Sequence, residues 1–233
     1  MPTAFISHTD CLLHDMGLHH PESPARLKAI EDELARSGLM DKLERHLAPL
    51  ATLGQLKRVH APEYIALLDA AARQALSAGL VNLDPDTAMN QYSLKSAYRA
   101  AGAVILATDI VAGKQVENAF CSIRPPGHHA ERNRAMGFCL FNNVAAGVAH
   151  AIEAHDLERV AVVDFDVHHG NGTENIFRDD PRVMMVSTFQ HPLYPYSGVK
   201  GRSERMVNIP LGAGSDSKLF REAVSEFWLP AVE

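Results

Sequence analysis

Val162-Val163-Asp164-Phe165-Asp166-Val167-His168-His169-Gly170-Asn171-Gly172 is an apolar run that turns abruptly into acids, imidazoles and glycines. The pattern predicts a buried strand that delivers metal ligands to a loop. Because side chains alternate between the two faces of an extended chain, Asp164, Asp166 and His168 are expected on one side, with Phe165 and Val167 packed behind them. Charged groups at the end of a buried strand are costly unless they are paired or bind a metal. A metal site is therefore favoured over a polar loop with a helix-capping aspartate.

A second apolar run, residues 116–123, ends in Arg124-Pro125-Pro126-Gly127-His128-His129. The prolines fix φ and the glycine permits a close backbone approach, so the two imidazoles are expected on a rigid loop. A pair of histidines alone is weak evidence of function. Beside the acidic end of the other strand, the pair becomes a candidate for general-base catalysis.

Strand and helix patterns alternate along the chain, which predicts one α/β domain with a mostly parallel sheet and helices on both faces. Ligands of such sheets bind beyond the carboxyl ends of the strands, where both histidine motifs fall. The expected strands are residues 3–7, 116–123, 159–165, 183–188 and 207–210, and the expected helices are residues 24–37, 62–77, 93–111, 142–154 and 217–232.

Composition narrows the function classes. The 233 residues are 46% hydrophobic, enough for a substantial core, and we expect a single domain over residues 1–233. The net charge of −6 argues against direct nucleic-acid binding, although an acidic surface could attract cationic tails or polyamines. Self-association is left open by these features.

Cysteine use and hydropathy indicate the compartment. Cys11, Cys121 and Cys139 are odd in number and have no CxxC spacing, which favours reduced thiols in the cytoplasm. The N-terminus lacks the basic and hydrophobic regions of a signal peptide. The most apolar span, residues 100–112, is too short for a bilayer, so we expect a soluble protein without membrane contact.

Five motifs together resemble the histone deacetylase and acetylpolyamine amidohydrolase superfamily, particularly its bacterial class II-like members. They begin at His20-Pro21-Glu22, at Arg124, at Gly137-Phe138-Cys139, at Asp164 and at His191-Pro192-Leu193-Tyr194, and they occur in the family's order. The resemblance implies an arginase/deacetylase-like fold. It also implies zinc-dependent hydrolysis of N-acetyl-lysine in proteins or peptides, with release of acetate.

Roles carried over from the family give a catalytic centre. Asp166 and His168 match two of the three zinc ligands. His129 matches the general base, and His128 matches the histidine held by a carboxylate, here Asp164. Asn171 stands beside the second histidine where some relatives carry aspartate. A neutral partner should raise the pKa of that imidazole less than a carboxylate would.

Further positions match residues that surround the catalytic centre in the family. Gly137, Phe138 and Tyr194 match the tunnel that receives the acyl-lysine, and Arg26 matches a position that lines the acetate route or forms an ordinary helix-start salt bridge. Asp164 and Ser187 match a structural monovalent cation site, with potassium as the implied ion.

The chain departs from the family in two features. The family's third zinc ligand is an aspartate in a Gly-Phe-Asp turn, and its transition-state tyrosine follows a Gly-Gly pair. Neither motif occurs here. We therefore expect a C-terminally incomplete catalytic domain that is impaired by itself, because a catalytic zinc normally has three protein ligands. Asp179, Asp180 and Asp216 are interpreted as turn or cap residues rather than as substitutes.

Two other functions stay open. Hydrolysis of acetylpolyamines or other small amides would use the same scaffold, with the tunnel rim deciding between substrates. Residues 83–87 lie where relatives place a substrate contact, but their two aspartates do not align securely with it. A metal-binding or interaction module without catalysis would explain the missing ligand and tyrosine. Arginase-like chemistry is disfavoured because a di-metal site needs more carboxylates.

Overall fold

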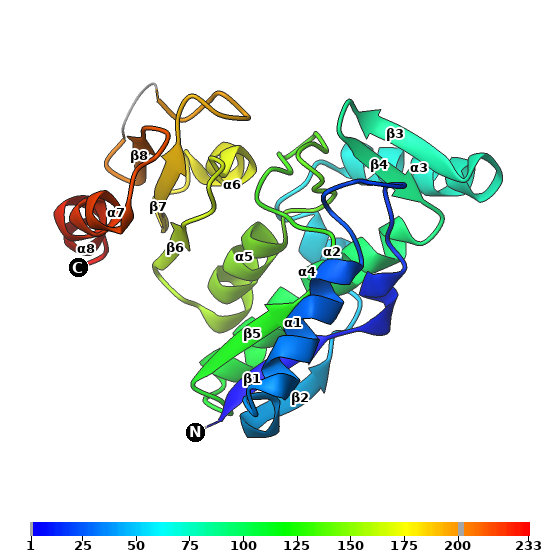
Figure 1. Ribbon diagram of the computed structural model, residues 1–233, viewed down its shortest axis with the longest axis horizontal. Helices are drawn as coiled ribbons and strands as arrows, with labels where there is room; N and C mark the ends of the chain where they lie inside the picture. The colour runs from blue at the N-terminus through cyan, green and yellow to red at the C-terminus, as the bar shows by residue number, and fades with distance from the viewer. Residues whose placement is uncertain (1, 200–202) are drawn as a thin grey trace.

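The parallel strands form two three-stranded sheets in the computed structural model, which describes residues 2–199 and 203–233. The first sheet has the order β2-β1-β5, and the second has the order β6-β7-β8 (Figure 1). Every pairing within the two sheets is parallel. The strands are β1 (Thr3–Ser7), β2 (Leu43–Leu47), β5 (Asn118–Ser122), β6 (Val160–Asp164), β7 (Val183–Gln190) and β8 (Met206–Leu211).

The expected α/β class with mostly parallel strands is confirmed, but the expectation of one continuous sheet is wrong for the described residues. No described pairing joins β5 to β6. An apolar groove of about 800 Å³ instead runs along β6 and is lined from the other side by α4 (Ser93–Ala112) and α5 (Asn143–His155). The alternation of strands and helices was readable from the sequence, whereas strand adjacency depends on pairing partners that it does not specify.

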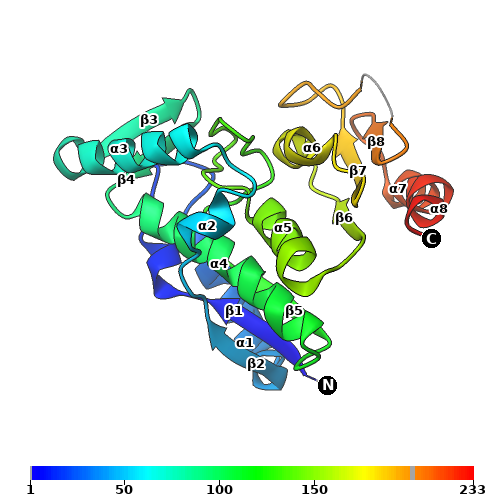
Figure 2. The same cartoon turned by 180° about the vertical axis from the view of Figure 1, so that it is seen from behind.

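Helices lie on both sides of the first sheet. In Figures 1 and 2, α1 (Ala25–Arg36) and α4 appear on opposite faces of the sheet that contains β1, and α5 lies beside α4. The second sheet is covered by α7 (Ser217–Ala223), a π-helical turn (Val224–Trp228) and α8 (Leu229–Val232), with Trp228 packed among apolar residues of β7 and β8. In the described residues, no helix has the length and hydropathy to cross a membrane.

The expected strand and helix boundaries lie within two residues of the observed ones, except that the single helix expected over residues 217–232 is divided into α7, the π-helical turn and α8. Several shorter elements were not expected. The sequence of β2, Leu-Glu-Arg-His-Leu, is too polar to predict a strand, and a hairpin forms where a loop was expected. The additional elements are the hairpin strands β3 (Leu80–Asp84) and β4 (Thr87–Asn90) and the helices α2 (Leu53–Leu56) and α6 (Asn171–Phe177), together with two short 3₁₀ turns (Thr9–Leu12 and Met40–Lys42). The remaining helix, α3 (Pro62–Ala78), was predicted.

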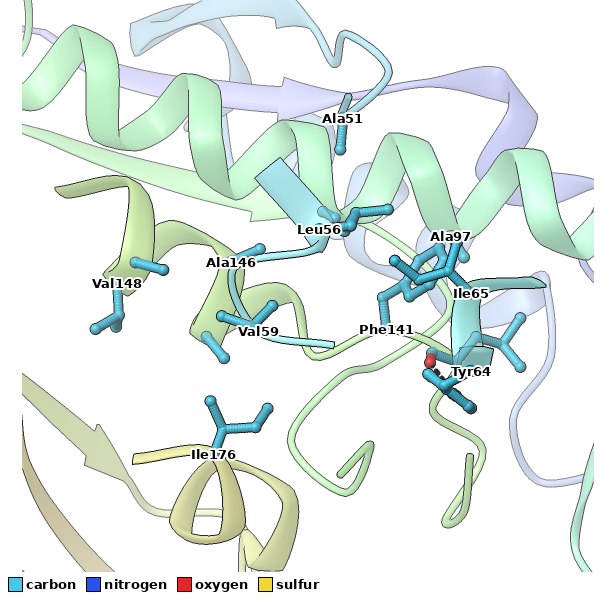
Figure 3. Close-up of a cluster of buried hydrophobic side chains, with 14 of the residues drawn as sticks. Ala51, Leu56, Val59, Tyr64, Ile65, Ala97, Phe141, Ala146, Val148 and Ile176 are labelled. Carbon is cyan, nitrogen blue, oxygen red and sulfur yellow. Dashed lines mark hydrogen bonds between the residues drawn. The ribbon is translucent and has the colours of Figure 1, made fainter. Parts of the chain in front are cut away.

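The largest apolar cluster lies where α2, α3, α4 and α5 meet (Figure 3). Leu56, Leu68 and Phe141 are fully buried there. The phenol of Tyr64 donates a hydrogen bond of 2.5 Å to the carbonyl of Leu140, which satisfies the polar end of a buried aromatic ring. This packing fixes the segment that leads from the predicted tunnel motif into α5.

Candidate active site

The ends of β5 and β6 bring the two histidine motifs together. His128 lies beyond the end of β5, and the first turn of α6 follows the acidic end of β6. The backbone N–H groups of Gly172 and Thr173 donate to the carbonyl of His128, at 3.0 and 3.2 Å. The glycine is required at 172, since an added Cβ would lie 2.3 Å from the carbonyl oxygen of Ala130. The two loops are therefore held against each other by their backbones.

His128 and Asp164 form an ion pair at the floor of the site. The Nδ1 atom of His128 lies 3.0 Å from Oδ2 of Asp164, whose other oxygen accepts the backbone N–H of Asp166 at 3.1 Å. Burial alone would lower the pKa of His128, but the hydrogen bond and negative charge of Asp164 outweigh it and raise that pKa above its usual value. The pairing expected from the sequence is thus present, and it favours a positively charged ring.

His129 is held in one tautomer by Asn171. The amide nitrogen of Asn171 donates to the carboxylate of Glu131 at 2.8 Å, so its oxygen faces His129 and accepts from Nδ1 at 2.8 Å. The other ring nitrogen is left with its lone pair. Burial, followed by the charge of His128, lowers the pKa of His129 to about 3, so the ring is neutral near pH 7. A neutral imidazole of fixed tautomer can accept a proton at Nε2.

Asp166 and His168 converge beside this pair. Oδ1 of Asp166 accepts the backbone N–H of His168 at 2.8 Å and lies 3.1 Å from the Nδ1 atom of that ring. It is also 3.9 Å from Nε2 of His128. One carboxylate and one imidazole that meet at a half-exposed point are ligands that suit zinc. The described residues place no third carboxylate, imidazole or thiol with these two in a three-donor group.

The packing expected behind these ligands is wrong. Phe165 is 72% exposed and Val167 is 50% exposed, so neither side chain packs into a core. The reason is that these side chains line the open groove along β6, where Val163, inside the strand, is also 46% exposed. The strand itself ends at Asp164, two residues before the first predicted zinc ligand.

A cavity of about 530 Å³ opens over the histidines and is walled by aromatic side chains. Phe138 and Tyr194 both line it, and the ring of Tyr194 meets that of His129 edge-on, with centroids 5.2 Å apart. The hydroxyl of Thr87 accepts the backbone N–H of Phe138 at 3.0 Å. The cavity also contains Gly137, Arg26, Asp86, Asp166 and His168 in its lining.

Gly137 is required by two local constraints. Its φ of +56° lies in the left-handed region, and an added Cβ would stand 2.2 Å from Cδ2 of His129. Glycine at this position allows the chain to pass directly over the imidazole. The tunnel wall and the candidate base are consequently placed by the same turn.

Ser187 and Asp164 lie side by side on β7 and β6, where their Cα atoms are register partners. Ser187 is fully buried, and its hydroxyl oxygen has no hydrogen-bond partner among the described residues. A buried hydroxyl without a partner is costly unless something else satisfies it. This environment fits the expected monovalent cation.

A buried ion pair beneath the cavity was missed at the sequence level. The guanidinium of Arg124 donates to both carboxylate oxygens of Glu22, at 2.5 and 2.6 Å, and to the carbonyl of Cys11 at 2.8 Å. Arg26 lies 3.8 Å from the same carboxylate and is more than half exposed, so it both lines the cavity and forms the expected helix-start pair. Glu22 belongs to the His-Pro-Glu motif, which marked it as a residue of interest. Its partner Arg124 lies 102 positions away, so the sequence did not indicate the pair.

His14 completes this network and gives stability a pH dependence. It is fully buried, 2.7 Å from the hydroxyl of Ser93, and burial followed by the charge of Arg124 lowers its pKa to about 3. An unfolded histidine titrates near pH 6.5. Below that pH the unfolded chain binds a proton that the folded chain refuses, so stability falls as the pH decreases toward 3. At pH 5 the expected loss is about 2 kcal/mol.

Urea unfolding at pH 7.5 and pH 5.0 tests this. The His14→Gln variant is expected to lose about 2 kcal/mol less than the unmodified chain over this interval. The matched control is Ser77→Ala, which changes an exposed side chain of α3 that carries no titratable group and should leave the pH dependence as it was. Equal pH dependence in His14→Gln and the unmodified chain would contradict the assignment.

The remaining acidic residues also have clear positions. Asp180 pairs with Arg182, and Asp216 caps α7 by accepting two backbone N–H groups, as expected for a turn and a cap residue. Of the two aspartates left unaligned in residues 83–87, Asp84 binds Arg134 at 2.8 Å whereas Asp86 lines the cavity. Cys139, next to the tunnel motif, is fully buried.

Comparisons with known proteins show the family of this chain. The model of the histone deacetylase domain matches residues 20–233. A histone deacetylase-like amidohydrolase of Pseudomonas aeruginosa is 35% identical over 99% of this chain and 66% of its own length. The human polyamine deacetylase HDAC10 is 40% identical over 80% of this chain and 29% of its own length. The crystal structure of the HDA15 HD domain matches with a TM-score of 0.91 and 33% identity, over 98% of this chain and 69% of that one.

The chain therefore belongs to the histone deacetylase family. It has the α/β fold of that family and spans about two thirds of the length of the Pseudomonas relative.

Proposed function

We propose that the protein is a zinc-dependent deacetylase that hydrolyses the N-acetyl-lysine of proteins or peptides and releases acetate. The observation that carries this proposal is the juxtaposition of a neutral, oriented His129 with the Asp166–His168 pair at one end of the aromatic-walled cavity. General-base and metal-ligand chemistry then meet where a narrow acyl chain can enter.

Zinc held by Asp166 and His168 would supply Lewis-acid polarisation of the acetyl carbonyl and acidify water. His129 accepts the proton of the attacking water at Nε2 and returns it to the leaving amine, while Asn171 keeps its Nδ1–H in place. His128, charged beside Asp164, adds positive potential near the developing oxyanion and orients the loop. Phe138 and Tyr194 exclude water from the acyl chain.

A potassium ion bound near Asp164 and Ser187 is part of this proposal. The unpartnered, buried hydroxyl of Ser187 supports it, as does the position of that residue directly beside the aspartate. Such an ion would stabilise the strand ends that carry the catalytic residues. The three free cysteines support a reducing, cytoplasmic location.

The proposed substrate is an acetylated lysine side chain, with an acetylpolyamine as the second candidate. The second candidate is favoured by one specific observation, the similarity to a protein described as a polyamine deacetylase. Both substrates present the same acetamide on an alkyl chain, so the zinc and histidine chemistry does not distinguish them. A catalytically inactive binding module is disfavoured by the prepared tautomer of His129, which a purely structural site would not need.

We propose further that the 233 residues alone turn over slowly. The described part of the chain offers two ligands at this position, whereas a catalytic zinc normally has three. A missing oxyanion donor alone costs about 10²–10³ in rate. Self-association would be one route by which a further residue could reach the site.

Acetate release from an acetyl-lysine peptide and from N-acetylspermidine tests the proposal. With zinc present, the full product of the gene that encodes this chain is expected to release acetate from the peptide, and the ratio of the two kcat/KM values shows which substrate is preferred. The 233 residues tested alone are expected to act on the peptide at least about 10³-fold more slowly than a deacetylase that carries three zinc ligands.

The matched control for this assay is the His129→Ala form of the full product, which should be slower by about 10²–10⁴. Hydrolysis of neither substrate by the full product would refute the deacetylase proposal. Rapid turnover by the 233-residue chain would show that another residue in it completes the site.

A further inference from the structure

Three metal-ligating side chains meet between two helices, away from the catalytic loops. Asp109 belongs to the last turns of α4, and His150 and His155 belong to the C-terminal half of α5. Figure 2 shows the two helices side by side. The catalytic loops instead lie toward the opposite end of α5, where Asn142 caps the helix and its amide nitrogen donates to the carbonyl of Ala130.

The geometry of this cluster is unusually convergent. The Nε2 atoms of His150 and His155 each lie 2.7 Å from the same oxygen, Oδ1 of Asp109. The two rings stand nearly perpendicular, with centroids 5.6 Å apart. Across residues 2–199 and 203–233, this is the one group of three or more His, Cys, Asp or Glu side chains whose ligand atoms all lie within 4.8 Å of one another.

The cluster is open to solvent on one side. The side chains of Asp109 and His155 are 46% and 25% exposed, while His150 is nearly buried. An ion can therefore enter from solvent and keep a water molecule as a further ligand.

We propose that Asp109, His150 and His155 form a second binding site for a divalent transition metal, with zinc as the preferred ion. Two imidazoles, one carboxylate and one water make a four-coordinate donor set that suits zinc. At Zn–N distances of about 2.0–2.1 Å, tetrahedral ligands stand about 3.3 Å apart, so the observed hydrogen-bonded group must open by about 0.6 Å. The ion would clamp α4 to α5 and serve a structural role.

Arg58 controls this site through His150. Its guanidinium donates to Nδ1 of His150 at 3.1 Å, so the metal-free ring keeps its proton on Nε2. A metal on Nε2 moves that proton to Nδ1, where a guanidinium cannot accept it. Arg58 is exposed and must turn away for the ion to bind. Replacing it by glutamine supplies an acceptor oxygen for Nδ1–H, and outer partners of this kind change metal affinity by about 10–100-fold.

Calorimetric titration with Zn²⁺ alone tests the site, using the 233-residue chain with His168→Ala so that the catalytic position contributes no competing imidazole. One equivalent is expected to bind. Adding His155→Ala should weaken binding by at least about 100-fold, and adding Arg58→Gln should strengthen it by about tenfold. Zinc at 100 times its Kd should raise the thermal midpoint of the parent by about 5–10 °C.

Two further variants make the result decisive. His46→Ala removes an imidazole that pairs with Glu44 on β2, and it should leave the affinity unchanged. Asp109→Asn keeps an acceptor oxygen while removing the charge, and it should weaken binding even if His155→Ala is destabilised. Circular dichroism establishes that each variant is folded. No binding by the parent, or equal affinity in the parent, His155→Ala and Asp109→Asn, would overturn the proposal.

Discussion

Replacing His168 by alanine is expected to slow acetate release from an acetyl-lysine peptide by at least about 10³-fold in the full gene product, because the imidazole is one of two described ligands for the proposed zinc. Without the imidazole, the remaining ligands no longer complete the three-ligand set of a catalytic zinc. The measurement is kcat/KM with zinc in the assay, together with the zinc content of the purified variant.

The matched control is His46→Ala, which removes an imidazole from β2, far from the cavity lining. Its kcat/KM should equal that of the unmodified protein. Full activity of His168→Ala in metal-free buffer would reject the zinc assignment. Loss of activity with full zinc content would instead mean that His168 contacts the substrate and is not a zinc ligand.

The second large effect concerns stability. A Glu22→Ala variant is expected to lose about 3–5 kcal/mol of unfolding free energy. The reason is that Arg124 is 2% exposed and would lose its hydrogen bonds to both carboxylate oxygens of Glu22. A buried guanidinium without a counterion has no access to water. Because Arg124 begins the loop that carries the tandem histidines, the same variant should also bind substrate poorly. Urea unfolding at pH 7.5 measures the effect.

Glu33→Ala provides the matched control for that experiment. Glu33 also binds an arginine through two hydrogen bonds, to Arg36, but the pair lies exposed on α1. Exposed pairs of this kind contribute little to stability. We expect a nearly unchanged unfolding midpoint in this variant. A comparable loss in Glu22→Ala and Glu33→Ala would mean that burial of the Arg124 pair has no special importance.

The sequence predicted that the two histidine motifs meet at one edge of a single sheet. They do meet, but β5 and β6 belong to different sheets, and backbone hydrogen bonds from Gly172 and Thr173 to His128 hold the two loops together. His128 does contact Asp164, and His129 does contact Asn171. The four residues of these two pairs all lie in motifs that resemble those of the family. The tunnel residues Gly137, Phe138 and Tyr194 were likewise found together with the histidines.

What could not be predicted depends on long-range packing. The Glu22–Arg124 pair spans 102 positions, and no local pattern signals that both charges are buried. The packing predicted for Phe165 is wrong because this residue lines an open groove along β6 that no local pattern signals. The cluster of Asp109 with His150 and His155 also escaped notice, since the three residues sit in helical stretches without any metal-binding spacing.

The two tandem histidines differ in the direction of their pKa shifts. The pKa of His128 is raised and that of His129 is lowered. This difference supports the proposed roles, a charged ring beside the aspartate and a proton-accepting ring beside the asparagine.

Anomalous X-ray diffraction at the zinc edge, from crystals of the zinc-loaded protein, tests the central claim most directly. The account predicts a peak within bonding distance, about 2.0–2.2 Å, of a carboxylate oxygen of Asp166 and a ring nitrogen of His168. Its location is distinguishable from the proposed second site beside His150. A fully loaded protein that shows no zinc touching Asp166 and His168 would contradict the account.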